Sequence, residues 1–252
     1  MRVFEIEKII EKEFPPETAY EWDNVGLLLG RHDAEISKVL VALDVTPETA
    51  EEAKACGAEL ILAHHPILFG GTKRITDESE EGKMLLDLVE NRICVYAAHT
   101  NCDVGVRGLN TYLAALFGLS EVEFLEENGL GRIGNIKKAV TLADFAEEVK
   151  RKLRTPHVRA GGDLTRLVRR VAVGSGACAD SIPRAMSKGA DVMLTADMKY
   201  HEMLNAVHSG ICVLDAGHYP TEAVVTDIFG KLLEGKGLEV VKSKEADVFK
   251  YL

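Results

Sequence analysis

The sequence contains no apolar run long enough to span a membrane, and its first residues lack the continuous apolar stretch of a secretory signal peptide. The sequence also has fewer positively than negatively charged residues. The 30 Lys and Arg residues are outnumbered by 40 Asp and Glu residues, which gives a formal net charge of −10. Because non-specific nucleic-acid binding and binding to anionic lipid both depend on positive charge, we expect neither nucleic acid nor a membrane as a partner. We expect a cytoplasmic protein.

Cysteine is sparse, and no two cysteines form a C-x-x-C pair. The five residues are an odd number, and Cys94 and Cys212 lie within apolar runs, where a thiol packs as a small hydrophobic side chain. We therefore interpret all five as reduced thiols of a cytosolic protein. Cys102 is the only cysteine for which a functional role is an alternative to a structural one, because it directly precedes Asp103.

The chain contains an internal repeat. The segment that starts at Val39 aligns without a gap with the segment that starts at Val171, at an offset of 132 positions, so that Gly57-Ala58-Glu59 matches Gly189-Ala190-Asp191. Each copy reads strand, helix, strand, helix, strand. The sequence thus predicts an α/β fold with two related three-layer lobes, which arose by internal duplication and enclose a metal cleft between them. Glycines between residues 118 and 135 mark the boundary, and we assign lobes to 1–124 and 125–252.

Short apolar runs are the expected strands. They are continuous rather than alternating, as in strands buried on both faces of a mainly parallel sheet. Thr46-Pro47 and Thr141-x-x-Asp144 are typical of helix starts. The six expected strands are 39–43, 60–63, 93–98, 171–173, 192–195 and 211–214.

Metal-binding residue types follow three of these runs, and ligands of open α/β sheets bind beyond the carboxyl ends of strands. Three imidazoles and two carboxylates suit Zn²⁺, Fe²⁺, Mn²⁺ or Ni²⁺ better than Ca²⁺. We predict two divalent ions, with Glu222 as the bridging carboxylate. The alternatives are that single histidines are structural and that Asp103 is a helix N-cap. The predicted ligands are His64, His65, Asp103, His218 and Glu222.

Four further features are ambiguous. Gly174-Ser175-Gly176 falls short of the full G-x-G-x-x-G motif, so we interpret it as a tight turn, with phosphate contact as the alternative. The segment 199–202 either contacts substrate or begins a helix, and 22–26 is either an entrance loop or a packing corner. We expect the remaining histidines to face solvent; these are His32, His157 and His208.

Taken together, these segments resemble the GTP cyclohydrolase 1 type 2 homologues, also called the NIF-three-like family. The resemblance covers nearly the whole chain. It is carried, in order, by 22–26, Ala63-His64-His65-Pro66, Ala98-His99-Thr100-Asn101-Cys102-Asp103, Gly131-Arg132-Ile133-Gly134, Lys199-Tyr200-His201 and 215–222. It implies a two-lobed protein with a dinuclear metal centre, often assembled as a hexamer, with the five ligands named above and His99 close to the metals as a catalytic or positioning group.

Two departures from the family pattern stand out. Thr195-Ala196-Asp197 replaces the usual Thr-Gly-Asp, and the connection between the lobes is too short for the domain that some members insert there. The resemblance favours a metal-dependent hydrolase acting on a small-molecule substrate such as a nucleotide, with His99 as general acid or base. Arg132, Lys199 and Lys73 are the candidate phosphate contacts. The alternatives are a non-catalytic metal-binding scaffold or regulatory interaction protein, and a scaffold with structural histidines.

Overall fold

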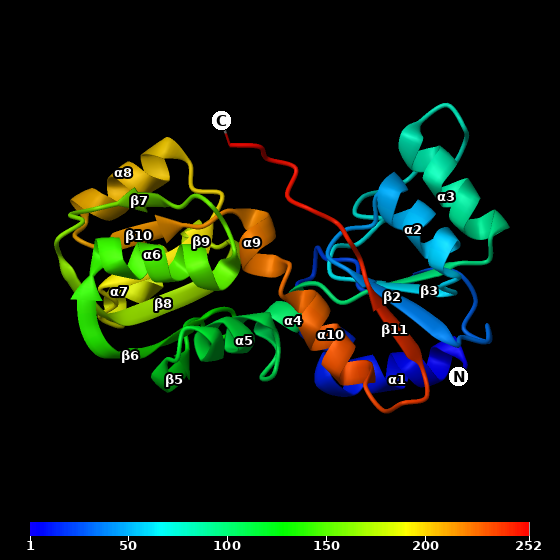
Figure 1. Cartoon of the computed structure of the whole chain (residues 1–252), viewed down its shortest axis with the longest axis horizontal. Helices are drawn as coiled ribbons and strands as arrows, with labels where there is room; N and C mark the ends of the chain where they lie inside the picture. The colour runs from blue at the N-terminus through cyan, green and yellow to red at the C-terminus, as the bar shows by residue number, and fades with distance from the viewer. Residues whose placement is uncertain (252) are drawn as a thin grey trace. The chain divides into compact units, whose positions relative to one another are not determined.

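The computed structural model describes residues 1–251, which form two separate sheets flanked by helices (Figure 1). This confirms the α/β class. The described residues group into two compact units: unit 1 holds Met1–Cys102 and Val225–Ala246, and unit 2 holds Asp103–Val224 and residues 247–251. No helix within residues 1–251 is both long and apolar enough to cross a membrane.

Unit 1 is built on a five-stranded sheet. Its four strands β2, β3, β4 and β11 run parallel, and β1 joins the edge antiparallel to β4. The side chains of β3 and β4 are entirely buried, as expected for strands covered on both faces. The strand order is β1 (Gly26–Leu29), β4 (Cys94–Ala97), β3 (Leu60–Ala63), β2 (Lys38–Ala42) and β11 (Glu239–Lys242).

Helices cover both faces of this sheet (Figure 1). On one face, α2 (Pro47–Cys56) and α3 (Glu80–Glu90) enclose an apolar cluster that includes Leu40, Ile61 and Leu88. On the other, α1 (Val3–Glu13) and α10 (Val225–Leu233) meet, and the rings of Phe14 and Phe229 pack edge to face at 6.3 Å. A 3₁₀ turn, η1 (Pro16–Thr18), follows α1. The predicted start of α2 is confirmed, because Thr46 accepts a hydrogen bond from the Thr49 amide.

Unit 2 is built on a six-stranded sheet in which β8, β9 and β10 run parallel and the other strands pair antiparallel. The strand order is β5 (Ser120–Phe124), β6 (Arg132–Thr141), β8 (Leu167–Ala177), β9 (Val192–Ala196), β10 (Cys212–Asp215) and β7 (Arg159–Gly161).

The sheet of unit 2 is also the middle of three layers. Helices α5 (Leu109–Leu116) and α6 (Leu142–Leu153) cover one face, where Phe145 packs against Val171. Helices α7 (Ile182–Ser187) and α8 (Tyr200–His208) cover the other, where Ala206 packs in the cluster of Ala172. The predicted cap Thr141 is confirmed at the start of α6. The remaining helical segments are α4 (Thr100–Val104), η2 (Ala179–Ser181) and α9 (His218–Glu222).

The two sheets share a parallel core of the same design. In unit 1, Val39 pairs with Leu60, and in unit 2 the aligned residues Val171 and Val192 pair in the same way. This common register supports the duplication inferred from the sequence. The compact units nevertheless differ from the ranges 1–124 and 125–252 that the repeat defines, because α5 packs on the sheet of unit 2 and β11 pairs with β2 of unit 1.

Candidate metal centre

Three histidines gather at the carboxyl ends of β3 and β4 in unit 1. His64 and His65 follow β3, and His99 follows β4. Because these strands are parallel and Ala63 lies opposite Ala97, their ends are adjacent. One ring nitrogen of each histidine lies within 4.8 Å of the others, so the three imidazoles could contact one cation.

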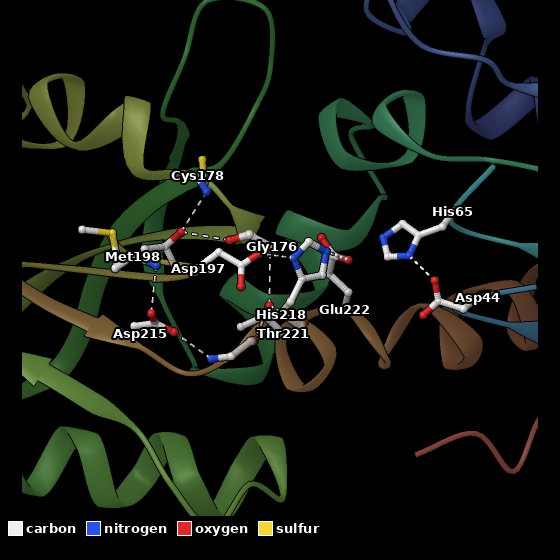
Figure 2. A network of polar contacts seen from close by, with 12 residues as sticks. Asp44, His65, Gly176, Cys178, Asp197, Met198, Asp215, His218, Thr221 and Glu222 are labelled. Atoms are coloured by element: carbon white, nitrogen blue, oxygen red, sulfur yellow. Dashed lines mark hydrogen bonds and ion pairs between the residues drawn. The ribbon is translucent and has the colours of Figure 1, made fainter. Parts of the chain in front are cut away.

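Each of these imidazoles is held through its Nδ1 atom. The Nδ1 of His64 lies 2.8 Å from the carbonyl oxygen of Ala98, and that of His65 lies 2.8 Å from the Asp44 carboxylate (Figure 2). The Nδ1 of His99 lies 2.9 Å from Asp23. Since a carbonyl or carboxylate oxygen only accepts, each Nδ1 donates the hydrogen, which leaves Nε2 as the nitrogen that can bind a metal. Metal-binding histidines are oriented in this way.

Asp23 is held as an anion beside His99. Its buried side chain also accepts hydrogen bonds from the amide and hydroxyl of Thr100. Burial opposes ionisation, but the hydrogen bonds from His99 and Thr100 outweigh it and lower the pKa of Asp23 to about 2. No pattern in the chain connected the segment 22–26 with His99, so this orienting residue was missed.

Asp44 is also fixed, by a residue far away in sequence. The backbone amides of Leu43 and Asp44 both donate to the carboxylate of Glu245, in the segment that follows β11. This clamp sets the position of the carboxylate that holds His65. Asp44 and Glu245 were likewise missed, because only the pairing of β11 with β2 brings the segment after β11 to the end of β2.

Unit 2 supplies the other three candidate residues. His218 and Glu222 lie one turn apart on α9, with Nε2 and Oε2 separated by 2.8 Å, and a carboxylate oxygen of Asp103 lies within 4.8 Å of one of Glu222. Asp103 and Glu222 are buried. The helix begins at His218 rather than near Pro220, because Gly217 takes a left-handed φ of 85° that turns the chain there.

His218 follows the same orientation rule as the histidines of unit 1. Its Nδ1 lies 2.7 Å from the carboxylate of Asp197, a residue in the left-handed region at φ 54° (Figure 2). The hydrogen bond with Glu222, helped by Asp197 and opposed by burial, raises the pKa of His218 to about 9. A cation at Nε2 would compete with that proton, so metal affinity at His218 should fall as pH decreases.

The Gly174-Ser175-Gly176 segment supports the two carboxylates. The Ser175 hydroxyl donates to Asp103 at 3.2 Å. Gly176 lies at φ 54°, and a Cβ added there would sit 2.1 Å from Oε1 of Glu222. The tight-turn interpretation was wrong, because the segment lies inside β8, where it forms the wall against which the two carboxylates rest.

Other predicted residues have structural roles. Arg132 is buried, and its guanidinium donates to the carbonyls of Gly105, Gly129 and Gly131 and to the Thr111 hydroxyl. Its predicted phosphate contact was wrong, because all of these donors point into the fold. Lys199 is the N-cap of α8, which begins at Tyr200, as the helix-start interpretation expected. His32, His157 and His208 are exposed as predicted.

The cysteines fit their structural interpretation. Cys102 is completely buried, and Cys94 and Cys212 expose no more than 2% of their surface. Burial raises the pKa of Cys94 and Cys212, and it raises that of Cys178 to about 11, which keeps these thiols protonated at neutral pH.

Comparison with known proteins gives consistent matches along the whole chain. A family model described as Duf34/NIF3 (NGG1p interacting factor 3) matches residues 1–247. A GTP cyclohydrolase 1 type 2 homolog from Lactococcus lactis is 37% identical over 240 residues, with 93% of each chain covered. A protein of the same name from Clostridium perfringens is 34% identical over the full length of both. A solved Bacillus cereus protein related to NIF3 has a TM-score of 0.96 at 27% identity, covering 100% of this chain and 99% of that one.

Proposed function

Because this chain belongs to the Duf34/NIF3 family, we propose that it binds two divalent metal ions and hydrolyses a nucleotide or a related heterocycle. Imidazole and carboxylate ligands favour Zn²⁺, Fe²⁺, Mn²⁺ or Ni²⁺. His99 acts as the general acid or base rather than as a ligand. The proposed ligands are His64 and His65 of unit 1 and Asp103, His218 and Glu222 of unit 2.

The orientation of the imidazoles is the observation that carries this proposal. The three histidines proposed as ligands, His64, His65 and His218, each use Nδ1 to contact a carboxylate or carbonyl oxygen, at 2.7 to 2.8 Å. This contact leaves Nε2 as the nitrogen for a metal, which is how metal-binding histidines are oriented. The residues therefore fit the cations that the family resemblance implies.

The residues of the chain have separate tasks in the proposed reaction. When bound, the ions would supply a nucleophile at neutral pH and polarise the bond to be broken. His99 takes or returns a proton at Nε2, because Asp23 occupies its Nδ1. The ionised Asp23 stabilises the imidazolium that forms after His99 has accepted a proton.

The names of the relatives suggest a purine nucleotide as the substrate class. Lys73 and Arg74 are exposed on the connection between β3 and α3, and neither forms an ion pair with any residue from 1 to 251. They are therefore available for an anionic group such as phosphate.

Metal binding is tested first. Protein purified without a His tag should contain near-stoichiometric metal by elemental analysis, and Glu222→Ala should lose it. Glu127→Ala is the matched control, because that side chain is 89% exposed and contacts only Arg184. Metal-free wild type after incubation with each of the four ions would contradict the proposal.

Catalysis is tested with a nucleotide panel and the loaded protein. His99→Ala should keep its metal and lose about 100-fold or more in kcat. If His99→Ala loses the metal instead, His99 is a ligand, in keeping with its distance to His64 and His65.

Assembly and location belong to the same proposal. We propose a cytoplasmic homohexamer, as the resemblance implies, and light scattering with and without chelator would measure it. If chelation dissociates the assembly while no nucleotide is consumed, the metal serves a non-catalytic scaffold.

A further inference from the structure

Beside the histidines of unit 1 lies a group of aromatic rings that the proposed reaction does not yet use. Trp22 packs edge to face against Phe69, with ring centroids 5.7 Å apart, and its ring is tilted against that of Tyr20 at 5.5 Å. Both Trp22 and Phe69 also reach the imidazole of His99, at 6.1 and 6.0 Å. The rings thus border the proposed general acid or base.

These two rings are unusually exposed for their size. Trp22 is 59% exposed and Phe69 is 56% exposed. Large aromatic side chains normally bury most of their surface, so their exposure beside a reactive group indicates a binding surface.

The rings are held in place by polar contacts. Asp23, next to Trp22, is bonded to His99, and the Asn24 amide donates to the carbonyl of Leu68 at 2.5 Å. The second contact ties the Trp22 segment to the residue before Phe69. Preorganised rings lose little entropy when a ligand stacks on them.

We propose that Trp22 and Phe69 form a stacking platform for the flat heterocyclic ring of the substrate, next to His99. The inference rests on the proposed function, and it adds the part of the site that would recognise the ring. Stacking uses the π-face that every nucleobase presents, and it would set the reacting ring against the imidazole. The neighbours of the platform in the chain favour a small ligand over a protein partner, because Asn24 follows Trp22, Lys73 and Arg74 follow Phe69, and all three are exposed polar residues.

Trp22 is the only tryptophan of the chain, so its fluorescence reports on this platform alone. Chelator-treated full-length protein is titrated with GMP, and with ribose 5-phosphate as the probe that lacks the base. GMP should quench the fluorescence saturably, and ribose 5-phosphate should not. Equal responses to both probes, or no response to GMP, would overturn the platform.

Variants of Phe69 separate stacking from general damage. Phe69→Ala should weaken GMP binding about tenfold, and Phe69→Tyr should retain it. Phe4→Ala is the control, because it removes a half-buried phenyl ring from α1 and should leave GMP binding unchanged. If Phe69→Ala binds GMP as wild type does but has a smaller mass by light scattering, the rings form an interface between copies and the inference is wrong.

The metal content of the same proteins distinguishes the two proposals. Phe69→Ala should keep its metal while losing GMP affinity, and Glu222→Ala should lose its metal while still binding GMP. Wild type that takes up none of the four ions and still binds GMP would reject the proposed dinuclear function and leave the platform standing. Metal-loaded wild type that does not bind GMP would reject the platform alone.

Discussion

His65 is held by Asp44, 21 residues earlier in the chain, and His99 is held by Asp23, 76 residues earlier. In unit 2, Asp197 holds His218 in the same manner. At the scale of single residues, the acceptor at Nδ1 decides which nitrogen is presented to a cation. These aspartates should therefore matter to metal affinity although none of them is a proposed ligand.

Replacing Asp44 tests this directly. Asp44→Ala should weaken metal binding about 10- to 100-fold, because His65 loses the contact that fixes its ring and tautomer. The measurement is competition against a chelator of known affinity. Asp33→Ala is the control, since Asp33 is an exposed aspartate that contacts only Arg31. Equal metal affinity in the two variants would show that Asp44 does not orient the ligand.

The absence of a side chain at Gly176 lets its backbone lie close to the carboxylate of Glu222. Gly176→Ala should reduce stability by about 1–2 kcal/mol through its left-handed backbone, and it should also push away the Glu222 carboxylate. Gly189→Ala has comparable backbone strain at φ 76° but meets no atom within 4 Å.

The two glycine variants are compared by urea unfolding and by metal titration. Both should lose similar stability, and only Gly176→Ala should lose metal affinity. If Gly189→Ala loses metal affinity to the same degree, the effect comes from strain and not from the contact with Glu222.

At the scale of elements, one buried side chain ties several segments of unit 2 together. Arg132 lies at the start of β6 and joins it to Gly105 after α4, to Thr111 in α5 and to the turn at Gly129 and Gly131. Its guanidinium also lies over the ring of Phe124 at 4.2 Å. Burial lowers its pKa to about 10, so it stays charged at neutral pH without a carboxylate partner.

Removing this clamp should cost stability. Arg132→Met keeps much of the apolar volume but leaves the buried carbonyls without a donor, and we expect a loss of about 3 kcal/mol in the free energy of unfolding. Arg169→Met, on the exposed side of β8, should change it by less than about 0.5 kcal/mol. Urea unfolding measures both, and a similar small effect of the two changes would contradict the structural role assigned to Arg132.

At the scale of the whole molecule, the chain divides its candidate ligands between two folding units. It passes from unit 1 to unit 2 after Cys102, returns at Val225, and leaves again after Ala246. His64, His65 and His99 belong to unit 1, whereas Asp103, His218 and Glu222 belong to unit 2. A metal pair that uses both sets would therefore link the stability of the two units.

Metal loading tests this linkage. At a free metal concentration about 100-fold above Kd, wild type should gain about 2.7 kcal/mol, and chelator should reverse the gain. Hydrogen exchange should show new protection both at 64–66 and at 218–222. Protection confined to one unit would mean that the ion is bound by that unit alone. In the Glu222→Ala variant, metal should add no protection at 64–66 or at 218–222.

Much of the fold could be predicted from local pattern. Continuous apolar runs marked β2, β3, β4, β8, β9 and β10, and Thr46 and Thr141 marked helix starts. The strands β1, β5, β6, β7 and β11 were not predicted. Four of them, β1, β5, β7 and β11, are short and lie at sheet edges, where one neighbour is missing and the apolar pattern is weak. In the longer β6, Lys137 and Lys138 are exposed and interrupt the apolar run.

The sequence by itself determined which residue types follow which strands, because buried strands and their polar ends leave a pattern in the chain order. It therefore named His64, His65, Asp103, His218 and Glu222 as candidate ligands, and the family resemblance added His99 beside them. Only the tertiary structure decided how those side chains are held, since Asp23, Glu245 and Gly176 reach them through strand pairing and backbone approach. Such contacts join residues that are far apart in the chain, and chain order carries no record of distance in space.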